Sequence, residues 1–337
     1  MTARRLRRLL PLLTLILVAC NPLAPGAGPS GSPPSSHGVA GLGSGTPAVP
    51  RVSGLKEPYG VAVGNGAVWV TEYLRGQLVR IDPATNSIVT RVPLGGHAAQ
   101  LVVQDGFVWV IDDQHRFIVQ VDATSNQVVE KIPTFDLRPA GIAGSSGSVW
   151  VTLGSSANLN RAAPILSELV RIDTATKAKT IIMIDGLAAG VTVGGGAVWV
   201  STILLEPMSI FRIDPATNRV VARVETGHAV SGPLAFGDSA LWVANNDGYL
   251  TRIDSRTNKV VGNFEVGSPE WAAILPVGKN LWISAPLDGI LARFDPATGD
   301  VASTVRAGSR PQMFALLGSD IWVASYGDGT LAKVPIN

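Results

Sequence analysis

Three histidines and several carboxylates lie in short polar stretches between apolar runs, and their side chains are the best suited to chemistry. A histidine can act as a general base when it lies within reach of a carboxylate or of a substrate. His97 follows Gly-Gly and His228 follows Thr-Gly, so the two occupy comparable positions. We take His97, His228 and Glu72 as the candidate catalytic residues. A solvated loop position is the alternative for each histidine.

The same polar stretches carry large amphipathic and charged side chains of the kind that dominates recognition. Asp113 and Arg138 lie among them, and so does Trp271, which is the one tryptophan out of phase with the other seven. Trp271 is therefore either a ligand contact or a locally packed residue. The candidate ligand-binding residues are Tyr59, Tyr73, His115, Asp247, Glu270, Trp271, Arg310 and Tyr326.

Several other kinds of site are excluded by the sequence. It contains no phosphate-cradling glycine loop, no nucleophile elbow and no His-x-x-x-His pair. Cys20 is the only cysteine, which removes disulfides and thiolate metal sites. We predict no metal-ligating residue and no cofactor, and a magnesium ion enters only with an enzymatic alternative.

The elements that must position these residues are defined by a repeated tryptophan. Trp69, Trp109, Trp150, Trp199, Trp242, Trp282 and Trp322 recur at spacings of 40, 41, 49, 43, 40 and 40 residues, each within a run such as Ala-Val-Trp-Val. A period of about 40–45 residues made of short β-type runs is typical of a propeller blade. Both neighbours of each tryptophan are apolar, so we expect these strands to be buried on both faces.

One repeat contains four short β-rich runs, at 60–63, 67–71, 77–81 and 87–92. Gly64-Asn65-Gly66 predicts a tight hairpin between the first two, because Gly and Asn adopt positive φ at low cost. Asp82-Pro-Ala-Thr-Asn86 joins the last two and recurs in five later units beginning at Asp122, Asp173, Asp214, Asp254 and Asp295. Turn chemistry accounts for these aspartates, and metal binding is the alternative.

The fold prediction is an all-β, seven-bladed propeller of four-stranded antiparallel blades. The seventh unit supplies only three runs, at 314–317, 321–324 and 330–334, before the chain reaches Asn337. Residues 48–52 resemble the fourth run of the first unit and are expected to complete the last blade. Pairing of the first and last strands in one blade would close the ring. The third unit is longer, and its residues 153–166 are interpreted as a lid, a partner contact or a tolerated surface loop.

The segment before the ring has the composition of an export signal. Residues 1–19 combine an arginine-rich start with an apolar stretch too short to span a bilayer. Leu17-Val-Ala-Cys20 resembles the bacterial lipoprotein box, which predicts lipidation of Cys20; a plain secretory signal is the alternative. Residues 20–48 are rich in Pro, Gly and Ser and are expected to form a disordered tether. The propeller then spans 49–337, in the cell envelope outside the cytoplasm.

Charge argues against nucleic acid as a partner. The whole chain has 27 Lys and Arg residues against 25 Asp and Glu residues. Loss of residues 1–19 removes four arginines, so that 23 basic residues face 25 acidic ones and the formal net charge is −2. Such a balance, without basic runs, does not favour nucleic-acid binding. We expect a monomer attached to the membrane, with a protein or glycan as its ligand.

Two stretches resemble known propeller families. Leu241–Val261, followed by Val266-Gly267, resembles the YVTN-type repeat of the YncE-like propellers. Trp69-Val-Thr-Glu72 with Leu78–Pro83 is similar to the repeat of the streptogramin B (virginiamycin B) lyases. This resemblance implies a seven-bladed ring. It also implies a magnesium-dependent elimination with a histidine base and carboxylates at the channel mouth, where Glu72 matches a motif carboxylate.

The corresponding positions of later units carry neither Glu nor an accompanying His, as in Ala244-Asn-Asn-Asp247. The leading hypothesis is therefore a binding scaffold for a protein, peptide or glycan at the channel mouth. A metal-dependent lyase or lactonase and a purely structural envelope component are the alternatives. Contact of one histidine with two carboxylates would favour the enzyme.

Overall fold

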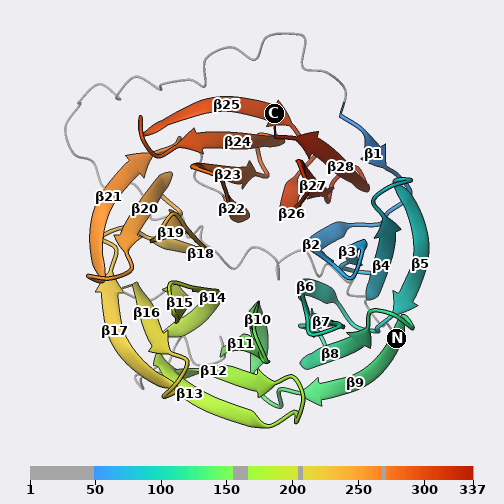
Figure 1. The fold of residues 1–337 in the computed structure, drawn as a ribbon, viewed down its shortest axis with the longest axis horizontal. Coiled ribbons are helices and arrows are strands. Elements are labelled where there is room, and N and C mark those ends of the chain that lie inside the picture. Colours follow the sequence, from blue (N-terminus) through green and yellow to red (C-terminus); the bar gives the residue numbers. More distant parts are fainter. Residues whose placement is uncertain (1–48, 155–165, 204–207, 268–270, 337) are drawn as a thin grey trace, which may run out of the picture. The chain divides into compact units, whose positions relative to one another are not determined.

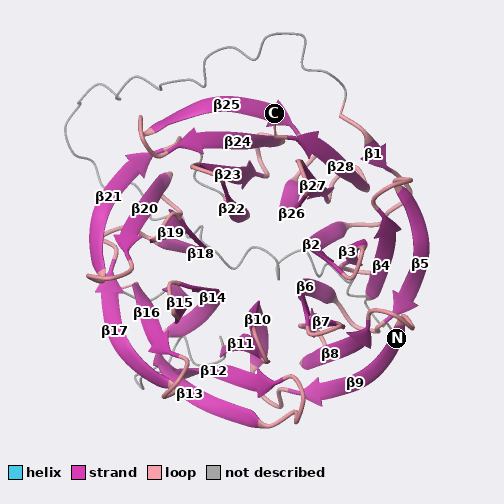
Figure 2. Cartoon of the chain, viewed as in Figure 1, coloured by secondary structure: helices cyan, strands magenta, loops and turns pink. Residues whose placement is uncertain are grey.

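The ring consists of seven four-stranded antiparallel sheets arranged around a central axis (Figure 1). The computed structural model describes residues 49–154, 166–203, 208–267 and 271–336. All regular elements in these ranges are strands (Figure 2). The same ranges contain no helix long and apolar enough to cross a membrane. The predicted all-β, seven-bladed propeller is therefore confirmed.

Each of the first four blades is a meander of consecutive strands, with the first strand nearest the axis and the fourth at the rim (Figure 1). Blade 1 is β2 (Pro58–Gly64), β3 (Ala67–Glu72), β4 (Gln77–Asp82) and β5 (Ser87–Pro93). Blade 2 is β6 (Ala98–Gln104), β7 (Phe107–Asp112), β8 (Phe117–Asp122) and β9 (Gln127–Pro133). Blade 3 is β10 (Arg138–Ser145), β11 (Ser148–Gly154), β12 (Leu166–Asp173) and β13 (Lys179–Asp185). Blade 4 is β14 (Leu187–Gly194), β15 (Ala197–Ile203), β16 (Ser209–Asp214) and β17 (Arg219–Glu225).

The remaining blades follow the same plan until the ring closes. Blade 5 is β18 (Val230–Gly237), β19 (Ala240–Asn245), β20 (Tyr249–Asp254) and β21 (Lys259–Glu265). Blade 6 is β22 (Ala273–Val277), β23 (Asn280–Ala285), β24 (Ile290–Asp295) and β25 (Asp300–Arg306). Blade 7 is β26 (Pro311–Leu317), β27 (Asp320–Ser325), β28 (Thr330–Pro335) and the N-terminal strand β1 (Arg51–Val52).

The two kinds of turn have the geometry that their residues predict. Asn65 and Gly66 both have positive φ, at 50° and 69°, as a type I′ hairpin requires. Asp82 accepts a hydrogen bond of 2.8 Å from the amide of Ala84, and Asn86 ends that turn at φ 55°. Hydrogen bonds from such backbone amides lower the pKa of the Asp82 carboxyl. These aspartates therefore act as turn residues.

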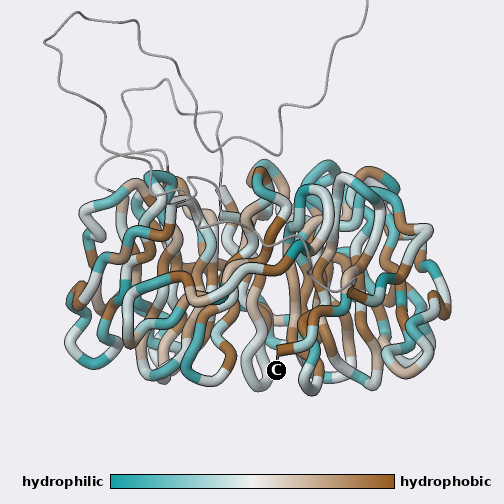
Figure 3. Tube along the Cα trace, turned by 90° about the horizontal axis from the view of Figure 1, so that it is seen from above, coloured by the Kyte–Doolittle hydropathy of each residue, from teal (hydrophilic) through white to brown (hydrophobic). Residues whose placement is uncertain are grey.

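The seven repeat tryptophans are buried between blades. Trp69 lies in one hydrophobic cluster with Val108 and Val110 of the following blade. Val68, on the opposite face of the same strand, lies in a cluster with Trp322 of the preceding blade. The strand is thus sandwiched, as its two apolar faces predict. In the side view of Figure 3 hydrophilic residues dominate the turns at both faces of the ring, with hydrophobic residues along the strands between them.

A hydroxyl two residues after the tryptophan joins neighbouring blades close to the axis. Thr71 Oγ1 accepts a 2.8 Å hydrogen bond from the amide of Gly60 and donates one of 2.8 Å to the carbonyl of Ala99 in the next blade. Thr152 and Ser201 make the equivalent pair of bonds in blades 3 and 4. These bonds set the spacing between the first strands, from which part of the candidate site projects.

The N-terminal strand closes the ring as predicted, although it is shorter than expected. Arg51 pairs with Ala332 and Val52 with Leu331. The carbonyl of Pro50 also accepts a 2.8 Å hydrogen bond from the amide of Lys333. The predicted strand covered 48–52, whereas β1 covers only residues 51 and 52.

Several predicted segments fall outside the described residues. They are the signal segment 1–19, Cys20 with the tether 20–48, and residues 155–165 of the long third unit. The flanking residues of that unit belong to strands, since β11 ends at Gly154 and β12 begins at Leu166.

Candidate functional site

The loops between blades and the loops between second and third strands meet on one face of the ring. The amide of Tyr73, which follows β3, donates a hydrogen bond to the carbonyl of Glu57, which precedes β2. The carbonyl of Tyr73 accepts one from the amide of Ala98, at the start of β6. We call this side of the ring the loop face. It carries most of the candidate residues from the sequence.

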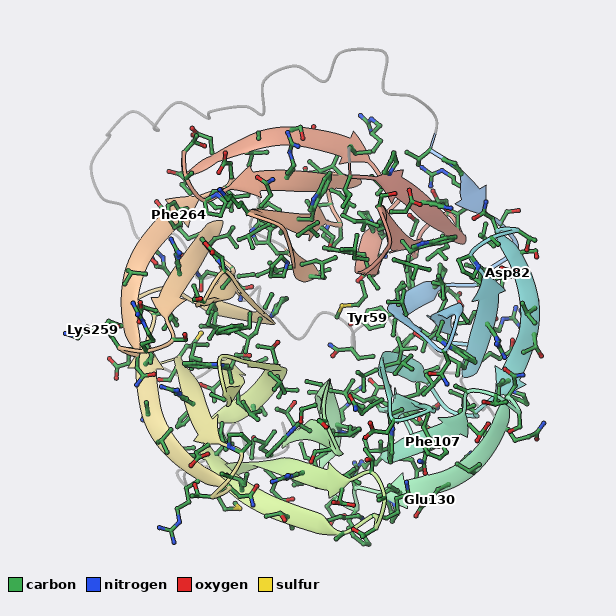
Figure 4. All side chains as sticks on the ribbon, in the orientation of Figure 1. Tyr59, Asp82, Phe107, Glu130, Lys259 and Phe264 are labelled. Atoms are coloured by element: carbon green, nitrogen blue, oxygen red, sulfur yellow. The ribbon has the colours of Figure 1, made fainter. Side chains whose placement is uncertain are left out.

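An aromatic group crosses the loop face from blade 7 to blade 2. The ring centroids of Tyr59 and Tyr73 are 5.6 Å apart, and those of Tyr73 and His97 are 4.7 Å apart. Tyr326 packs against the same hydrophobic cluster as Tyr59. In Figure 4, Tyr59 lies at the inner end of blade 1, toward the ring axis. We call Tyr59, Tyr73, His97 and Tyr326 the aromatic arc.

Asp113 organises the polar edge of the aromatic arc. Its carboxylate accepts a hydrogen bond of 3.1 Å from the Tyr73 hydroxyl and one of 2.6 Å from Arg138 Nη2. The same carboxylate lies 3.4 Å from His97 Nδ1. Burial and the negative charge of Asp113 raise the pKa of Tyr59 to about 12 and raise that of Tyr73 further. Both phenols therefore stay protonated at neutral pH, and the one hydroxyl proton of Tyr73 is engaged by Asp113.

Two carboxylates beside the arc hold the loops in place. Asp112 accepts hydrogen bonds from the amides of His97 and His115, at 3.2 and 3.0 Å. Gly96 has φ 64°, and a Cβ there would collide with that carboxylate. His115 Nδ1 lies 3.1 Å from Asp112, with the imidazole exposed above it. The side chain of His115 is thus held against Asp112 at the start of its own loop.

Glu72 has the same place in its repeat as Asp112 and the same structural task. It is 1% exposed and accepts a 2.7 Å hydrogen bond from the amide of Lys56. Its second oxygen lies 3.5 Å from Arg91 Nε. With both oxygens engaged and its surface buried, Glu72 presents no free oxygen to a ligand on the loop face.

A second group lies on blade 5. His228 Nδ1 lies 2.6 Å from Asp247, and the imidazole stacks on Tyr249 with ring centroids 4.5 Å apart. Asn245, the last residue of β19, is fully buried and donates a hydrogen bond to Thr251. The structure therefore brings together two predicted residues, His228 and Asp247, and adds Tyr249.

A third group lies where blade 7 meets blade 1. The Arg310 guanidinium lies over the Tyr326 ring, 5.5 Å from its centroid. Burial and the nearby Glu57 raise the pKa of the Tyr326 hydroxyl. Arg310 has φ 53°, and the amide of Tyr326 donates a hydrogen bond to its carbonyl. This contact places a cation at the blade 7 end of the aromatic arc.

Trp271 belongs to the hydrophobic core. It is 6% exposed and lies in the cluster that joins blades 5 and 6, together with Trp242 and Leu281. Of the two alternatives for Trp271, a ligand contact or local packing, its position fits local packing. Glu270 lies outside the described residues.

A carboxylate lies beside the ring of each of the three described histidines. The Nδ1 atoms of His97, His115 and His228 lie 3.4, 3.1 and 2.6 Å from Asp113, Asp112 and Asp247 respectively. Among the residues that the structure describes, no group of three or more His, Cys, Asp or Glu side chains could hold a metal ion. What the loop face assembles in this part of the chain is an aromatic and hydrogen-bonding surface.

Asp113 and Arg138 are the residues whose importance the sequence did not single out. Both are ordinary polar loop residues in the repeat, and only the fold brings them to Tyr73 across the boundaries between three blades. The one local signal is the pair Asp112-Asp113 at a position where blade 1 has Glu72-Tyr73. A second carboxylate there is more than a turn requires.

Comparison with known proteins supports the fold. No family model and no curated protein matches the chain. A catalytically inactive variant of virginiamycin B lyase from Staphylococcus aureus, with quinupristin, matches with a TM-score of 0.70 and 20% identity over 86% of this chain and 99% of that one. Hydrazine synthase from Kuenenia stuttgartiensis matches with a TM-score of 0.70 and 16% identity over 88% of this chain and 99% of that one.

BamB from Moraxella catarrhalis matches with a TM-score of 0.58 and 15% identity over 82% of this chain and 84% of that one. At these identities the likeness is one of fold. The resemblance to the streptogramin B lyase-like propellers is thereby confirmed for the ring architecture.

Proposed function

We propose that this protein is a lipid-anchored propeller outside the cytoplasm that binds a protein, peptide or glycan on its loop face. The observation that carries the binding proposal is the aromatic arc with Asp113 and Arg138 along its edge. Tyrosines supply large contact areas at low conformational cost and keep a hydroxyl for hydrogen bonding. A ring of packed blades holds them rigidly, which reduces the entropy lost on binding.

The chemistry of the arc favours an uncharged or mixed-charge ligand. Tyr59 and Tyr326 are half-buried and offer ring surface, and the protonated hydroxyl of Tyr59 can donate a hydrogen bond. Asp113 and Arg138 neutralise each other in a 2.6 Å ion pair. Sugar rings and peptide backbones both combine apolar faces with hydrogen-bonding groups, so both suit such a surface.

Binding is tested with Tyr59→Ala against a matched control, Leu287→Ala. Leu287 is 65% exposed, in the loop between the second and third strands of blade 6. Wild type is screened on glycan arrays and peptide arrays, and the affinity for each positive probe is then measured. We expect Tyr59→Ala to weaken binding about tenfold or more, because an aromatic anchor is removed, while Tm changes little.

The control decides how that result is interpreted. Leu287→Ala should keep wild-type affinity for the same probe. Equal effects of the two substitutions, or no probe bound by the wild type on either array, would contradict a binding site at the arc.

The anchor part of the proposal is supported by the sequence alone. The lipoprotein box ends at Cys20, which is the only cysteine. A single acyl-bearing cysteine followed by a Pro, Gly and Ser-rich tether would leave the ring free to meet ligands near the membrane surface. This arrangement also supports the placement outside the cytoplasm.

We expect Cys20→Ser to move the protein out of the membrane fraction or to leave an unprocessed precursor, because no thiol remains for acylation. Fractionation and mass spectrometry of the mature N-terminus measure both outcomes. A wild-type protein that is found in the soluble fraction with an unmodified N-terminus at another residue would disprove the anchor. Binding by the ring would be unaffected by that result.

A second candidate function rests on the His228–Asp247 pair. A carboxylate at Nδ1 orients an imidazole and leaves Nε2 available as a base. An enzyme that opens cyclic depsipeptides or lactones, with magnesium, would use such a group. Turnover of quinupristin or a simple lactone that requires magnesium and is lost in His228→Ala would replace the binding proposal.

A further inference from the structure

The fourth strands form the outer rim of the ring, and their outer edges have no partner strand in the described sheets. Open edges invite pairing with other chains, and proteins protect them with bulges, prolines and charged residues. In blades 1, 2, 4, 5 and 6 the fourth strand has a register shift against the third. The pairing of β13 with β12 is regular along its length. Blade 3 therefore presents the straightest outer edge among these six.

At two exposed positions β13 also lacks the protective polar side chains or prolines of five other fourth strands. Ile181 and Met183 are 57% and 51% exposed. Their cross-strand partners, Val170 and Glu168, define the matching positions in the other blades. Those positions hold Arg91 and Pro93, Lys131 and Pro133, Arg223 and Glu225, Asn263 and Glu265, and Thr304 and Arg306. The rims of these five blades thus have polar residues or proline where β13 has two apolar ones.

The sequence of β13 is complementary to itself when it is reversed. If two copies pair antiparallel about Ile182, Lys179 of one lies opposite Asp185 of the other, and Ile181 lies opposite Met183. All four side chains lie on the exposed side of the strand, so both ion pairs and both apolar pairs form on the same face. Such a contact is isologous and closes as a dimer.

We propose that this protein forms a homodimer through edge-to-edge pairing of β13 with β13 of a second copy, which joins two blades into one continuous sheet. The side chains at the two ends of the strand, Lys179 and Asp185, make long contacts within the ring that an ion pair across the dimer could replace. The Lys179 Nζ lies 3.5 Å from the carbonyl of Pro133, and Asp185 lies 3.6 Å from Arg223 in an exposed pair. One strand pair makes a small contact, so the dimer is reversible and depends on concentration. It differs from the monomer that the sequence indicates.

The test is sedimentation velocity of the purified full chain over a wide concentration range. Wild type is expected to shift from monomer to dimer as concentration rises. Ile181→Arg is expected to weaken association about tenfold or more, because each guanidinium then lies opposite Met183 of the second copy and diagonal to the like-charged guanidinium of that copy. The fold tolerates arginine there, since Arg91 and Arg223 hold the matching positions of blades 1 and 4. Val261→Arg is the control, because Val261 is equally exposed on the rim of blade 5.

A charge exchange tests the register. Lys179→Asp alone places two carboxylates opposite each other and should weaken the dimer, whereas Lys179→Asp combined with Asp185→Lys restores opposite charges and should recover it. Tm is measured for each variant because Asp185 also contacts Arg223. Monomeric wild type at every concentration, equal effects of Ile181→Arg and Val261→Arg, or failure of the double exchange to recover the dimer would each overturn the proposal.

Discussion

Deletion of residues 48–54 is expected to lower the free energy of unfolding by about 3–5 kcal/mol. The deletion removes β1 and leaves β28 with an unpaired edge in the last blade. Val52, which is 5% exposed, leaves the cluster that contains Trp322 and Leu331. The hydrogen bonds from Lys333 to Pro50 and from Arg51 to the carbonyl of Ala307 are also lost.

The matched control is deletion of residues 21–45, whose Pro, Gly and Ser-rich composition predicts little contribution to a core. Both truncated proteins are unfolded by heat and by urea, and their midpoints are compared with the wild type. We expect the control to melt with the wild type and the 48–54 deletion to melt well below it. Equal melting of the two deletions would mean that the ring does not depend on β1.

Strand positions follow closely from the repeat because each copy carries the same local signals. The second run of the first unit is predicted at 67–71, and β3 covers Ala67–Glu72. Asn65-Gly66 and Asp82–Asn86 specify their turns through backbone conformations that few other residues adopt. The closing strand is predicted less well. Pro50 has no amide hydrogen to donate, which limits the ladder to residues 51 and 52.

The candidate site follows from the sequence only as a set of loops. Propeller topology brings Tyr59, Tyr73 and His97 to one face, where their rings lie in contact. The hydrogen-bond partner of each carboxylate is set by contacts between blades, which lie about 40 residues apart in the sequence. Glu72 faces inward and caps a loop, whereas Asp113, one position further along its repeat, faces the arc. Side chains one residue apart at a strand end point in opposite directions, so these two carboxylates have different roles. The repeat spacing in the sequence does not reveal which of two adjacent residues faces the arc.

The sequence also leaves the role of the aromatic residue Trp271 open. Because it is out of phase with the repeat, its sequence position fits either a ligand contact or packing. The structure places it in the core between blades 5 and 6. The amide of Ala272 donates a 3.2 Å hydrogen bond to the carbonyl of Ser284, which fixes the backbone beside it.

We expect Trp271→Ala to destabilise the ring by about 3 kcal/mol, because the substitution leaves a cavity that packed blades cannot close. For a ring of this size the loss corresponds to a fall in Tm of roughly 5 °C. Trp271→Phe should lose about half as much, since it keeps an aromatic ring in the cavity, and Leu287→Ala should leave Tm unchanged because that side chain is exposed. Probe binding at the arc should survive Trp271→Ala below its melting temperature. Unchanged stability combined with lost binding would instead assign Trp271 to the ligand, and the loop beside it would then belong to the recognition surface.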